Sequence, residues 1–365
     1  MNILFQPANH YGFGHTSRLI AIASSIRRQQ PNVQLAFILE GEGAHPLLDA
    51  ASFPYLALPE SSQFCDRGIW TKWTDCDPAT IPFALAVAAM ERLQPDVVVF
   101  DSFPYLSILR AAISFELPIV LCARQTRDDA VYYRHLSAYA SALTLILLPH
   151  EPGTIDLPAS LASRTRYVGT IVRDASQAAN LPSTTFANEI IVTGGGGGIP
   201  RTVDFYNLAL AGFARCRARH PDVSCVLIAG PLFREWQELH LIDGIHVIPF
   251  EPHLQVRMSS ARLVICRGGY NTSAELSRTC VPCISIPATT TLDDQVKRAT
   301  EMAACSPGFH VYLGNDAQIL ADLMDSCLRA PPLTVHHARI REDGADVAAA
   351  AILEVGALFG DAATC

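Results

Sequence analysis

The chain has 365 residues, of which 50% are hydrophobic and 17% are charged, and its formal net charge is −8. A chain of this length predicts about two domains, and the composition is typical of an α/β protein with parallel strands buried on both faces. The acidic balance excludes a general nucleic-acid binder, which needs a basic face to neutralise phosphates. A small anionic ligand remains a candidate, because a local cluster of hydrogen-bond donors can oppose the global charge.

Cysteine usage and hydropathy indicate a protein of a reducing compartment without a membrane span. The eleven cysteines are scattered through apolar segments, and the first residues enter a strand-like run without the basic region of a signal peptide. We expect reduced, buried cysteines and a cytoplasmic protein that is either free or peripheral to a membrane. Cys280 and Cys283 have redox spacing but precede a strand, which disfavours a redox role. The apolar run 81–90 has about half the roughly 20 residues that a transmembrane helix needs.

Strands and helices alternate through the first half of the chain. A glycine-rich turn with Gly12, Gly14 and His15 follows the first apolar run, and apolar residues then recur at helical spacing from Leu19 to Ile26. Apolar runs predict strands at 3–5, 33–39, 97–100, 119–121 and 145–148. This alternation predicts right-handed βαβ units and a parallel sheet.

The same pattern restarts after a polar segment. The strand-like run 190–192 is followed by the glycines 194–198 and by a helix from about Val203. Further apolar runs predict strands at 226–228, 247–248, 263–265 and 284–286. Each half therefore starts with a strand, a glycine-rich turn and a helix. Two Rossmann-like domains that face each other across a cleft follow from this repetition.

We place the domain boundaries from these patterns. The first domain is expected over residues 1–169, a linker over 170–188 and the second domain over 189–335. A final helix is expected within 336–365, with Val347, Ala351, Val355 and Leu358 near helical spacing. In two-domain enzymes of this type a final helix often crosses back to the first domain.

Two loops of the second domain are candidate ligand sites, because open α/β sheets bind ligands at the carboxyl ends of their strands. In the first loop, glycines such as Gly195 and Gly196 would let the backbone approach a diphosphate, and the N–H groups at the start of the next helix would bind an anion. A flexible turn is the alternative interpretation.

The second loop is more specific. The strand 263–266 runs into Arg267, Gly268 and Gly269, and then into a helix that carries Glu275. The glycines permit a tight turn, the helix start favours a diphosphate, and Arg267 would add charge-assisted hydrogen bonds. Glu275 lies three residues after Thr272, which is the spacing of a capping box. Its functional alternative is a carboxylate that accepts hydrogen bonds from two ribose hydroxyls.

At these residues the chain resembles the family 28 glycosyltransferases, which have the GT-B architecture and include the bacterial peptidoglycan N-acetylglucosaminyltransferase. The similar stretch runs from Val247 through the 266–272 loop and Glu275, and it continues through Pro282 and Pro287 to Arg298 and Ala299. Motifs occur in the order and spacing of the family. Coarser similarity covers the rest of the chain.

The resemblance implies a nucleotide-binding role for several residues. Phe250 lies where the base of the nucleotide packs, and Glu275 matches the glutamate that binds the ribose. The diphosphate loop contains Gly268, Gly269, Asn271 and Thr272. Arg267 is placed to stabilise negative charge on the departing diphosphate.

The resemblance also assigns the residues that contact the transferred sugar. Asp294 and Gln295 match the pair that reads sugar hydroxyls. The adjacent carboxylates of Asp293 and Asp294 raise the alternative of a metal site, but GT-B enzymes usually hold the diphosphate with loops and helix dipoles. We therefore expect neither a required metal nor another cofactor, and the nucleotide-sugar enters as co-substrate.

The turn of the first domain carries the candidate base. The stretch from Gly12 to Arg18 resembles the Gly-x-Gly-His loop of GT-B enzymes, in which the loop, here with Gly14, faces the sugar. A histidine near neutral pKa can accept a proton from an attacking hydroxyl, so His15 is the candidate general base. Alternatively, His15 only shapes the loop or contacts phosphate, and His10 is a weaker candidate.

Asp101, at the end of the strand 97–100, is the candidate that orients His15, as in some related transferases. Its alternative role is to cap the next helix. Residues after the second and fifth predicted strands are candidates to line the acceptor site, namely Glu42, His45, Gln125 and Arg127.

Together these features predict an inverting, metal-independent transfer from a nucleoside-diphosphate sugar, a UDP-sugar being the expected donor, to the hydroxyl of an acceptor whose type the sequence does not define. A nucleotide-sugar hydrolase with the same donor site is one alternative, because such an enzyme of pseudaminic-acid biosynthesis has a similar Gly-x-Gly-His-x-x-Arg start. A catalytically inactive nucleotide-sugar-binding subunit is the other. The oligomeric state cannot be inferred from the sequence.

Overall fold

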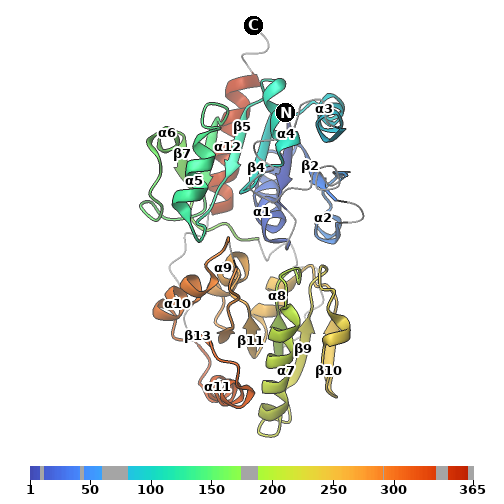
Figure 1. The fold of residues 1–365 in the computed structure, drawn as a ribbon, viewed down its shortest axis with the longest axis vertical. Helices are drawn as coiled ribbons and strands as arrows, with labels where there is room; N and C mark the ends of the chain where they lie inside the picture. The colour runs from blue at the N-terminus through green and yellow to red at the C-terminus, as the bar shows by residue number, and fades with distance from the viewer. Residues whose placement is uncertain are drawn as a thin grey trace. The chain divides into compact units, whose positions relative to one another are not determined.

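The computed structural model describes residues 1–8, 12–41, 45–59, 81–173, 188–290, 292–333 and 344–360. The chain divides into two compact units, one comprising residues 1–9, 15–173 and 341–365 and the other residues 10–14 and 174–340. Each unit is built on one sheet in which every strand pairs parallel to its neighbours (Figure 1). The predicted fold class, two Rossmann-like α/β domains, is confirmed. The predicted linker lies mostly outside the described residues.

The first unit contains a seven-stranded sheet in the order β3-β2-β1-β4-β5-β6-β7. Its strands are β1 (Asn2–Pro7), β2 (Gln34–Glu40), β3 (Tyr55–Leu58), β4 (Val97–Asp101), β5 (Ile119–Cys122), β6 (Leu145–Leu148) and β7 (Thr165–Tyr167). The chain builds the sheet outward from β1 to one side and then from β4 to the other. The order therefore reverses between β1 and β4, where Pro7 lies beside Asp101.

Helices cover both faces of this sheet because its strands are apolar on both sides. They are α1 (Gly14–Gln29), α2 (Pro46–Ala50), α3 (Ile81–Leu93), α4 (Leu106–Ser114), α5 (Asp129–Ser137) and α6 (Ala159–Ala162). Helices α3 to α6 contribute to one core with alternate strand residues such as Leu4, Val98 and Phe100. The strand residues between them point to the opposite face.

The last helix, α12 (Gly344–Gly360), packs against β4 of the first unit and is drawn in red in Figure 1. Its start is fixed by Asp346, which accepts hydrogen bonds from Ser25 and Arg28. Leu358 fits the helical spacing of this segment, but it is 73% exposed. The buried face instead follows Ala348, Ile352 and Val355, which ends one turn earlier.

The second unit contains a six-stranded sheet in the order β10-β9-β8-β11-β12-β13. Its strands are β8 (Glu189–Thr193), β9 (Ser224–Ile228), β10 (Ile245–Ile248), β11 (Leu263–Cys266), β12 (Cys283–Ser285) and β13 (Phe309–Val311). Here the order reverses between β8 and β11, and Thr193 lies beside Cys266. The two sheets therefore have the same strand order on both sides of the position where that order reverses.

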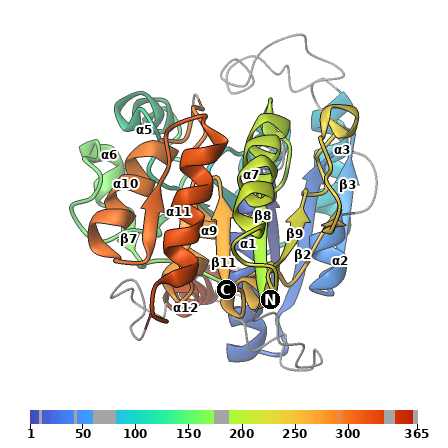
Figure 2. The same ribbon diagram turned by 90° about the horizontal axis from the view of Figure 1, so that it is seen from below.

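Two layers of helices cover the second sheet. The helices are α7 (Thr202–Arg217), α8 (Leu254–Ser259), α9 (Tyr270–Ser277), α10 (Gln295–Cys305) and α11 (Ala317–Arg329). Helices α7 and α11 lie side by side and share a core with Ile190 and Val192 (Figure 2). Helices α8, α9 and α10 share the other core with Ile191 and Val264. Alternate residues of the same strand thus contribute to the cores on opposite faces of the sheet.

Three short strands were missed by the sequence analysis, namely β3, β7 and β13. All three lie at sheet edges. Edge strands have one free side and need no continuous apolar run, so Thr165–Tyr167 offers no periodic signal. The described part of the chain contains eight free cysteines, of which six are buried. None of its helices is long and apolar enough to cross a membrane.

Candidate functional site

The first unit brings His15 and Asp101 together at the point where its sheet order reverses. His15 lies in the first turn of α1, the helix that follows β1, and Asp101 is the last residue of the neighbouring strand β4. The His15 Nδ1 atom lies 2.5 Å from Asp101 Oδ1. Arg18 Nε lies 2.9 Å from the other carboxylate oxygen, and the Ser102 hydroxyl donates a hydrogen bond of 2.8 Å to Oδ1.

These contacts determine the protonation state of the pair. Burial alone would raise the pKa of Asp101, but the charges of Arg18 and His15 and the hydrogen bonds from His15 and Ser102 hold that pKa below its ordinary value. Burial lowers the pKa of His15; Asp101 opposes this shift, whereas the charges of Arg124 and Arg18 reinforce it. At neutral pH the aspartate is therefore ionised and the imidazole is neutral. Its proton sits on Nδ1, because the carboxylate can only accept, and Nε2 keeps a lone pair.

The geometry excludes one alternative for Asp101. The next helix, α4, begins at Leu106 with Tyr105 as its N-cap residue, so Asp101 does not cap it. The carboxylate is fully buried. Sequence reasoning missed the partner Arg18, which is 3% exposed. The available signal was its spacing, since Arg18 lies one helical turn after His15 and therefore on the same face of α1.

The other residues predicted near the acceptor have different environments. His45 was expected to line the acceptor site, but it is 5% exposed, and its Nε2 atom lies 3.4 Å from the Thr16 hydroxyl. Burial lowers the pKa of His45 to about 4. His45 is therefore a neutral core residue, and the expectation is wrong. Arg127 is exposed, whereas His10 and Glu42 lie outside the described residues.

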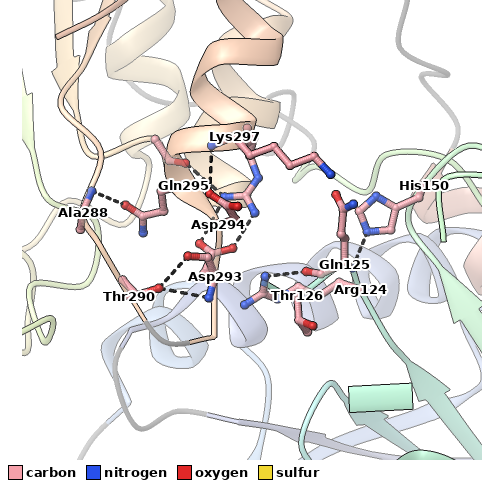
Figure 3. A network of polar contacts seen from close by, with 12 residues as sticks. Arg124, Gln125, Thr126, His150, Ala288, Thr290, Asp293, Asp294, Gln295 and Lys297 are labelled. Carbon is pink, nitrogen blue, oxygen red and sulfur yellow. Dashed lines mark hydrogen bonds and ion pairs between the residues drawn. The ribbon is translucent and has the colours of Figure 1, made fainter. Parts of the chain in front are cut away.

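The turn after β5 contains a basic residue that sequence reasoning passed over. Arg124 is 7% exposed, and its guanidinium donates a hydrogen bond of 3.1 Å to the carbonyl oxygen of Gln125. The backbone N–H of Gln125 donates to His150 Nε2 at 2.9 Å (Figure 3). Gln125 was a predicted acceptor-lining residue, and its backbone is held in this turn. Arg124 acts on His15 through its charge, as the pKa shift of the histidine indicates.

The second unit places both predicted glycine loops at its own point of reversal. One loop follows β8 and the other follows the neighbouring strand β11, so their first residues lie side by side. Gly195 and Gly269 have no described atom within 4 Å of the position that a Cβ atom would occupy. A ligand can therefore approach the backbone closely at these two residues. The backbone of Gly196 is held in place, because its carbonyl oxygen accepts a hydrogen bond from the Leu232 N–H.

The first glycine loop is held by defined contacts. The Gly194 N–H donates to the Tyr206 hydroxyl at 3.1 Å, and this hydroxyl donates to the Ala229 carbonyl oxygen at 2.6 Å. Gly197 has a φ angle of +80° and packs against Ala229 and Phe233. These contacts disfavour the interpretation of the loop as an unconstrained turn.

The two helix starts at this edge differ in their partners. We expected the start of α7 to offer N–H groups to an anion, but Glu235 accepts hydrogen bonds of 3.0 Å from the backbone N–H groups of Arg201 and Val203. This carboxylate occupies the place of an anion, so the expectation is wrong for α7. The start of α9 is different, because its N-cap residue is Gly269, which has no side chain to cap it. The first turn of α9 contains no acidic residue.

The bounds of α9 also decide between the two interpretations of Glu275. The helix begins at Tyr270, so Thr272 is a residue within its first turn and not the N-cap residue. A capping box between Thr272 and Glu275 is therefore excluded. Glu275 lies in the second turn and is 8% exposed. Asn271 is the second residue of the same helix and is half-buried.

Arg267 and Gly268 form the turn between β11 and α9. The Arg267 guanidinium lies 3.4 Å from the Thr202 hydroxyl and 5.4 Å from the centre of the Phe205 ring, at the first turn of α7. Burial lowers its pKa, but an arginine stays protonated at neutral pH. Gly268 has a φ angle of +70°, and a Cβ atom there would lie 2.5 Å from the Ser285 hydroxyl. This position therefore requires glycine for two independent reasons.

The predicted sugar-reading pair lies at the start of α10, after β12. Asp294 is the N-cap residue of this helix and accepts a hydrogen bond of 3.0 Å from the Lys297 N–H (Figure 3). Gln295 is 4% exposed, and its side-chain oxygen accepts a hydrogen bond of 2.9 Å from the Ala288 N–H. The orientation of the amide is thereby fixed, since a backbone N–H requires an acceptor. Asp293 pairs with Arg298.

The predicted donor residues gather at one edge of the second sheet. Phe250 follows β10, the glycines follow β8 and β11, and Asp294 and Gln295 follow β12. Carboxyl ends of parallel strands share one edge, so these segments are neighbours there. Among the described residues no group of three histidines, cysteines, aspartates or glutamates is arranged to hold a metal ion.

Comparisons with known proteins give the class and then the family. The chain is similar to the spinosyn forosaminyltransferase SpnP, with a TM-score of 0.60 and 15% identity over 98% of this chain and 95% of that chain. It is also similar to the UDP-GlcNAc 2-epimerase from Neisseria meningitidis bound to UDP-GlcNAc, with a TM-score of 0.57 and 13% identity over 97% and 99% of the two chains. At these identities the likeness defines the fold, and the fold is GT-B.

The family follows from the sequence of the second unit. Residues 190–318 match the glycosyltransferase family 28 C-terminal domain. The UDP-N-acetylglucosamine–N-acetylmuramyl-(pentapeptide) pyrophosphoryl-undecaprenol N-acetylglucosamine transferase of Rhodopseudomonas palustris (strain BisB5) is 28% identical over 251 residues, which span 64% of this chain and 64% of that protein. The predicted resemblance to family 28 is confirmed: this is a GT-B protein whose residues 190–318 match the C-terminal domain of that family.

Proposed function

We propose that the chain transfers a sugar from a UDP-sugar to an acceptor hydroxyl, with inversion at the anomeric carbon. The observation that carries the proposal is the start of α9, which follows the turn of Arg267, Gly268 and Gly269 and whose N-cap residue, Gly269, has no side chain. The family 28 match covers this segment. The curated relative is named for a UDP-N-acetylglucosamine donor, which supports a UDP-sugar as the donor class.

The donor would be held mainly by backbone groups. The N–H groups of the first turn of α9 would bind the diphosphate, with Gly269 allowing close approach and Asn271 and Thr272 in the same turn. Two buried hydroxyls, those of Ser273 and Ser285, have no hydrogen-bond partner in the described part of the chain. Buried polar groups normally find a partner, so a bound molecule or water next to this turn is expected.

The remaining donor contacts follow from the family resemblance. Glu275 would accept hydrogen bonds from the ribose hydroxyls, and Phe250 would pack against the base. Asp294 has a carboxylate for sugar hydroxyls besides its contact with Lys297, whereas Gln295 would offer its NH2 group, because its oxygen already binds Ala288. Arg267 and the α9 dipole would stabilise the departing UDP, so that the reaction needs no metal.

His15 would act as the general base of the transfer. Its neutral imidazole with a lone pair on Nε2 can take the proton of the acceptor hydroxyl as that oxygen attacks the anomeric carbon. The attack would come from the side opposite the diphosphate, which inverts the configuration. Asp101 would orient the ring and stabilise the imidazolium that forms, and Arg18 would keep Asp101 ionised.

Incubation with donors tests this proposal. UDP-glucose, UDP-N-acetylglucosamine and UDP-glucuronate would each be supplied alone and with a mixture of hydroxyl-bearing acceptors, and UDP, free sugar and glycosylated products would be measured by mass spectrometry. We expect UDP release to rise with acceptor and to match the glycosylated product. Free sugar released in step with UDP, with no uptake by any acceptor, would establish a hydrolase. Absence of UDP binding would refute both activities.

A further inference from the structure

Arg298 connects two loops of the second unit that are distant in the sequence. It is the fourth residue of α10, and its side chain is 18% exposed. Its guanidinium reaches the two Asp293 carboxylate oxygens at 2.5 and 3.2 Å. The Nη1 atom also donates a hydrogen bond of 3.2 Å to the carbonyl oxygen of Gly268. One planar side chain thus binds the turn after β11 and the loop after β12.

Each end of this connection is fixed in the structure. Gly268 has little freedom, because its φ angle is +70° and Ser285 lies directly behind it. On the same side, the guanidinium carbon of Arg298 lies 5.6 Å from the centre of the Tyr270 ring, in the first residue of α9. Arg298 therefore contacts the turn and the helix start to which the diphosphate is assigned.

The loop after β12, which contains Asp293, is held by hydrogen bonds between its own residues. The Thr290 hydroxyl accepts a hydrogen bond from the Asp293 N–H and donates one to the Asp293 carbonyl oxygen, and Gln295 holds the Ala288 N–H (Figure 3). A single bridge pairs Thr289 with Asp294. Movement of Asp293 would therefore move the whole loop, which includes the residues assigned to the sugar hydroxyls.

We propose that Arg298 is a positioning residue that holds the sugar-reading loop in a fixed place relative to the diphosphate turn. This inference rests on the proposed function, because it needs a donor that spans both segments. The planar fork of arginine binds a carboxylate through two nitrogens and keeps a further N–H for the carbonyl. A lysine would retain the charge beside Asp293 but lose this geometry. The sugar would then be held less accurately, although the diphosphate turn itself remains.

The consequence is a separation between nucleotide binding and sugar recognition. In this assignment UDP contacts Phe250, Glu275 and the diphosphate turn with its helix start, but not the sugar-reading loop, so its Kd should rise by less than about threefold in Arg298→Lys. A misplaced sugar-reading loop should lower kcat/KM for the preferred UDP-sugar by about 30-fold or more, since small displacements of reacting groups reduce rates strongly. Discrimination between UDP-glucose and its C4 epimer UDP-galactose should fall as well.

The experiment compares the wild-type chain with Arg298→Lys, Arg298→Gln, the double variant Asp293→Asn/Arg298→Gln, and Lys297→Gln. Lys297 is the adjacent residue on α10, 52% exposed, and serves as the matched control. UDP binding is measured by calorimetry, and donor cleavage is measured as UDP release with each epimer. The double variant removes the unpaired carboxylate of Arg298→Gln, so it keeps the test valid if that single variant is unstable.

The inference predicts that all variants without Arg298 lose epimer discrimination, including the double variant, while they still bind UDP. Lys297→Gln should match the wild type. A purely structural ion pair would give the opposite pattern, with discrimination restored in the double variant or with UDP binding and donor cleavage reduced equally, and either result would overturn the inference. A wild-type chain that binds UDP but shows no epimer preference would overturn it and leave nucleotide binding intact. A wild-type chain that binds neither UDP nor UDP-sugars would refute the proposed function and the inference with it.

Discussion

The two units place different kinds of groups at the same position of the same sheet plan. In the first unit the point of reversal holds the buried Asp101, whose carboxylate lies within 3 Å of the half-buried His15 and of the buried Arg18. In the second unit the equivalent point holds glycines with open space and the start of α9, whose N-cap residue is Gly269. Open α/β sheets bind ligands where the strand order reverses. Because the side chains at the strand ends differ, we expect this position to handle a proton in the first unit and an anion in the second.

Burial of charge has a different role in each of the two units. Removing Asp101 from water is tolerated because the contacts with Arg18, His15 and Ser102 keep the pKa of its carboxyl below the ordinary value. Burial of His15 lowers the pKa of its imidazole, although Asp101 opposes this shift. The start of α9 needs no buried charge, since backbone N–H groups provide the positive potential. We therefore expect substitutions in the first unit to act on chemistry and stability and those in the second to act on ligand affinity.

The largest expected effect comes from His15. The substitution His15→Ala should lower kcat by about 10²–10⁴-fold, which is the usual contribution of a general base, and leave the Kd for UDP within about twofold. Glu275→Ala should do the reverse, with weaker UDP binding by about tenfold, as expected when a charged hydrogen-bond acceptor is lost. Steady-state kinetics and calorimetry measure both. His246→Ala, an exposed histidine of β10, is the control.

These two variants directly test the difference between the two units. If His15→Ala weakened UDP binding and spared kcat, the histidine would contact phosphate instead of taking a proton. If Glu275→Ala left UDP binding unchanged, the family-based assignment of the ribose contact would be wrong.

A smaller effect on activity but a large one on stability is expected from Asp101→Asn. The change removes the charge that pairs with Arg18, which is 3% exposed. An uncompensated buried charge costs about 3–5 kcal/mol of unfolding free energy. Urea denaturation measures this loss. The control is Asp204→Asn, since the exposed pair of Asp204 and Arg201 should contribute little, and its midpoint should match the wild type. Equal midpoints for both variants would show that Arg18 finds other compensation.

The smallest effect is a pH dependence of stability in the first unit. His45 has a folded-state pKa of about 4 and an ordinary pKa of 6.5, so between these values the unfolded chain binds the extra proton. Stability should therefore fall as the pH is lowered from about 6.5 to about 4, by on the order of 3 kcal/mol from this residue. His45→Gln should show a shallower decline in unfolding free energy over this range, whereas His246→Gln should keep the wild-type decline. Identical slopes for wild type and His45→Gln would contradict the assignment.

Much of the fold and the general location of the site could be predicted from the sequence, because buried parallel strands and glycine turns leave local signals. The occupied start of α7 could not be predicted from the sequence, since the carboxylate that accepts its N–H groups comes from Glu235, more than thirty residues later. Burial of His45 likewise depends on Thr16 and Tyr55, which lie on other elements. Leu358 fits the helical period, yet it is exposed. In each case a tertiary contact decided what local sequence left open.

The roles of the site residues stay predictions, although the geometry narrows them. The bounds of α9 remove the capping-box alternative for Glu275, and the bounds of α4 remove the capping alternative for Asp101. For Gln295 the geometry leaves only the NH2 group for a sugar hydroxyl, because the side-chain oxygen already accepts a hydrogen bond from the Ala288 N–H. The sequence alone could not separate these alternatives, since each depends on where a helix starts.

Backbone hydrogen exchange with and without UDP tests the central claim most directly. The claim is that the start of α9, and not the start of α7, binds the diphosphate. UDP should slow the exchange of amides 269–273 and leave amides 202–204 unchanged, because Glu235 already occupies that helix start. Protection of 202–204 without protection of 269–273 would contradict the account.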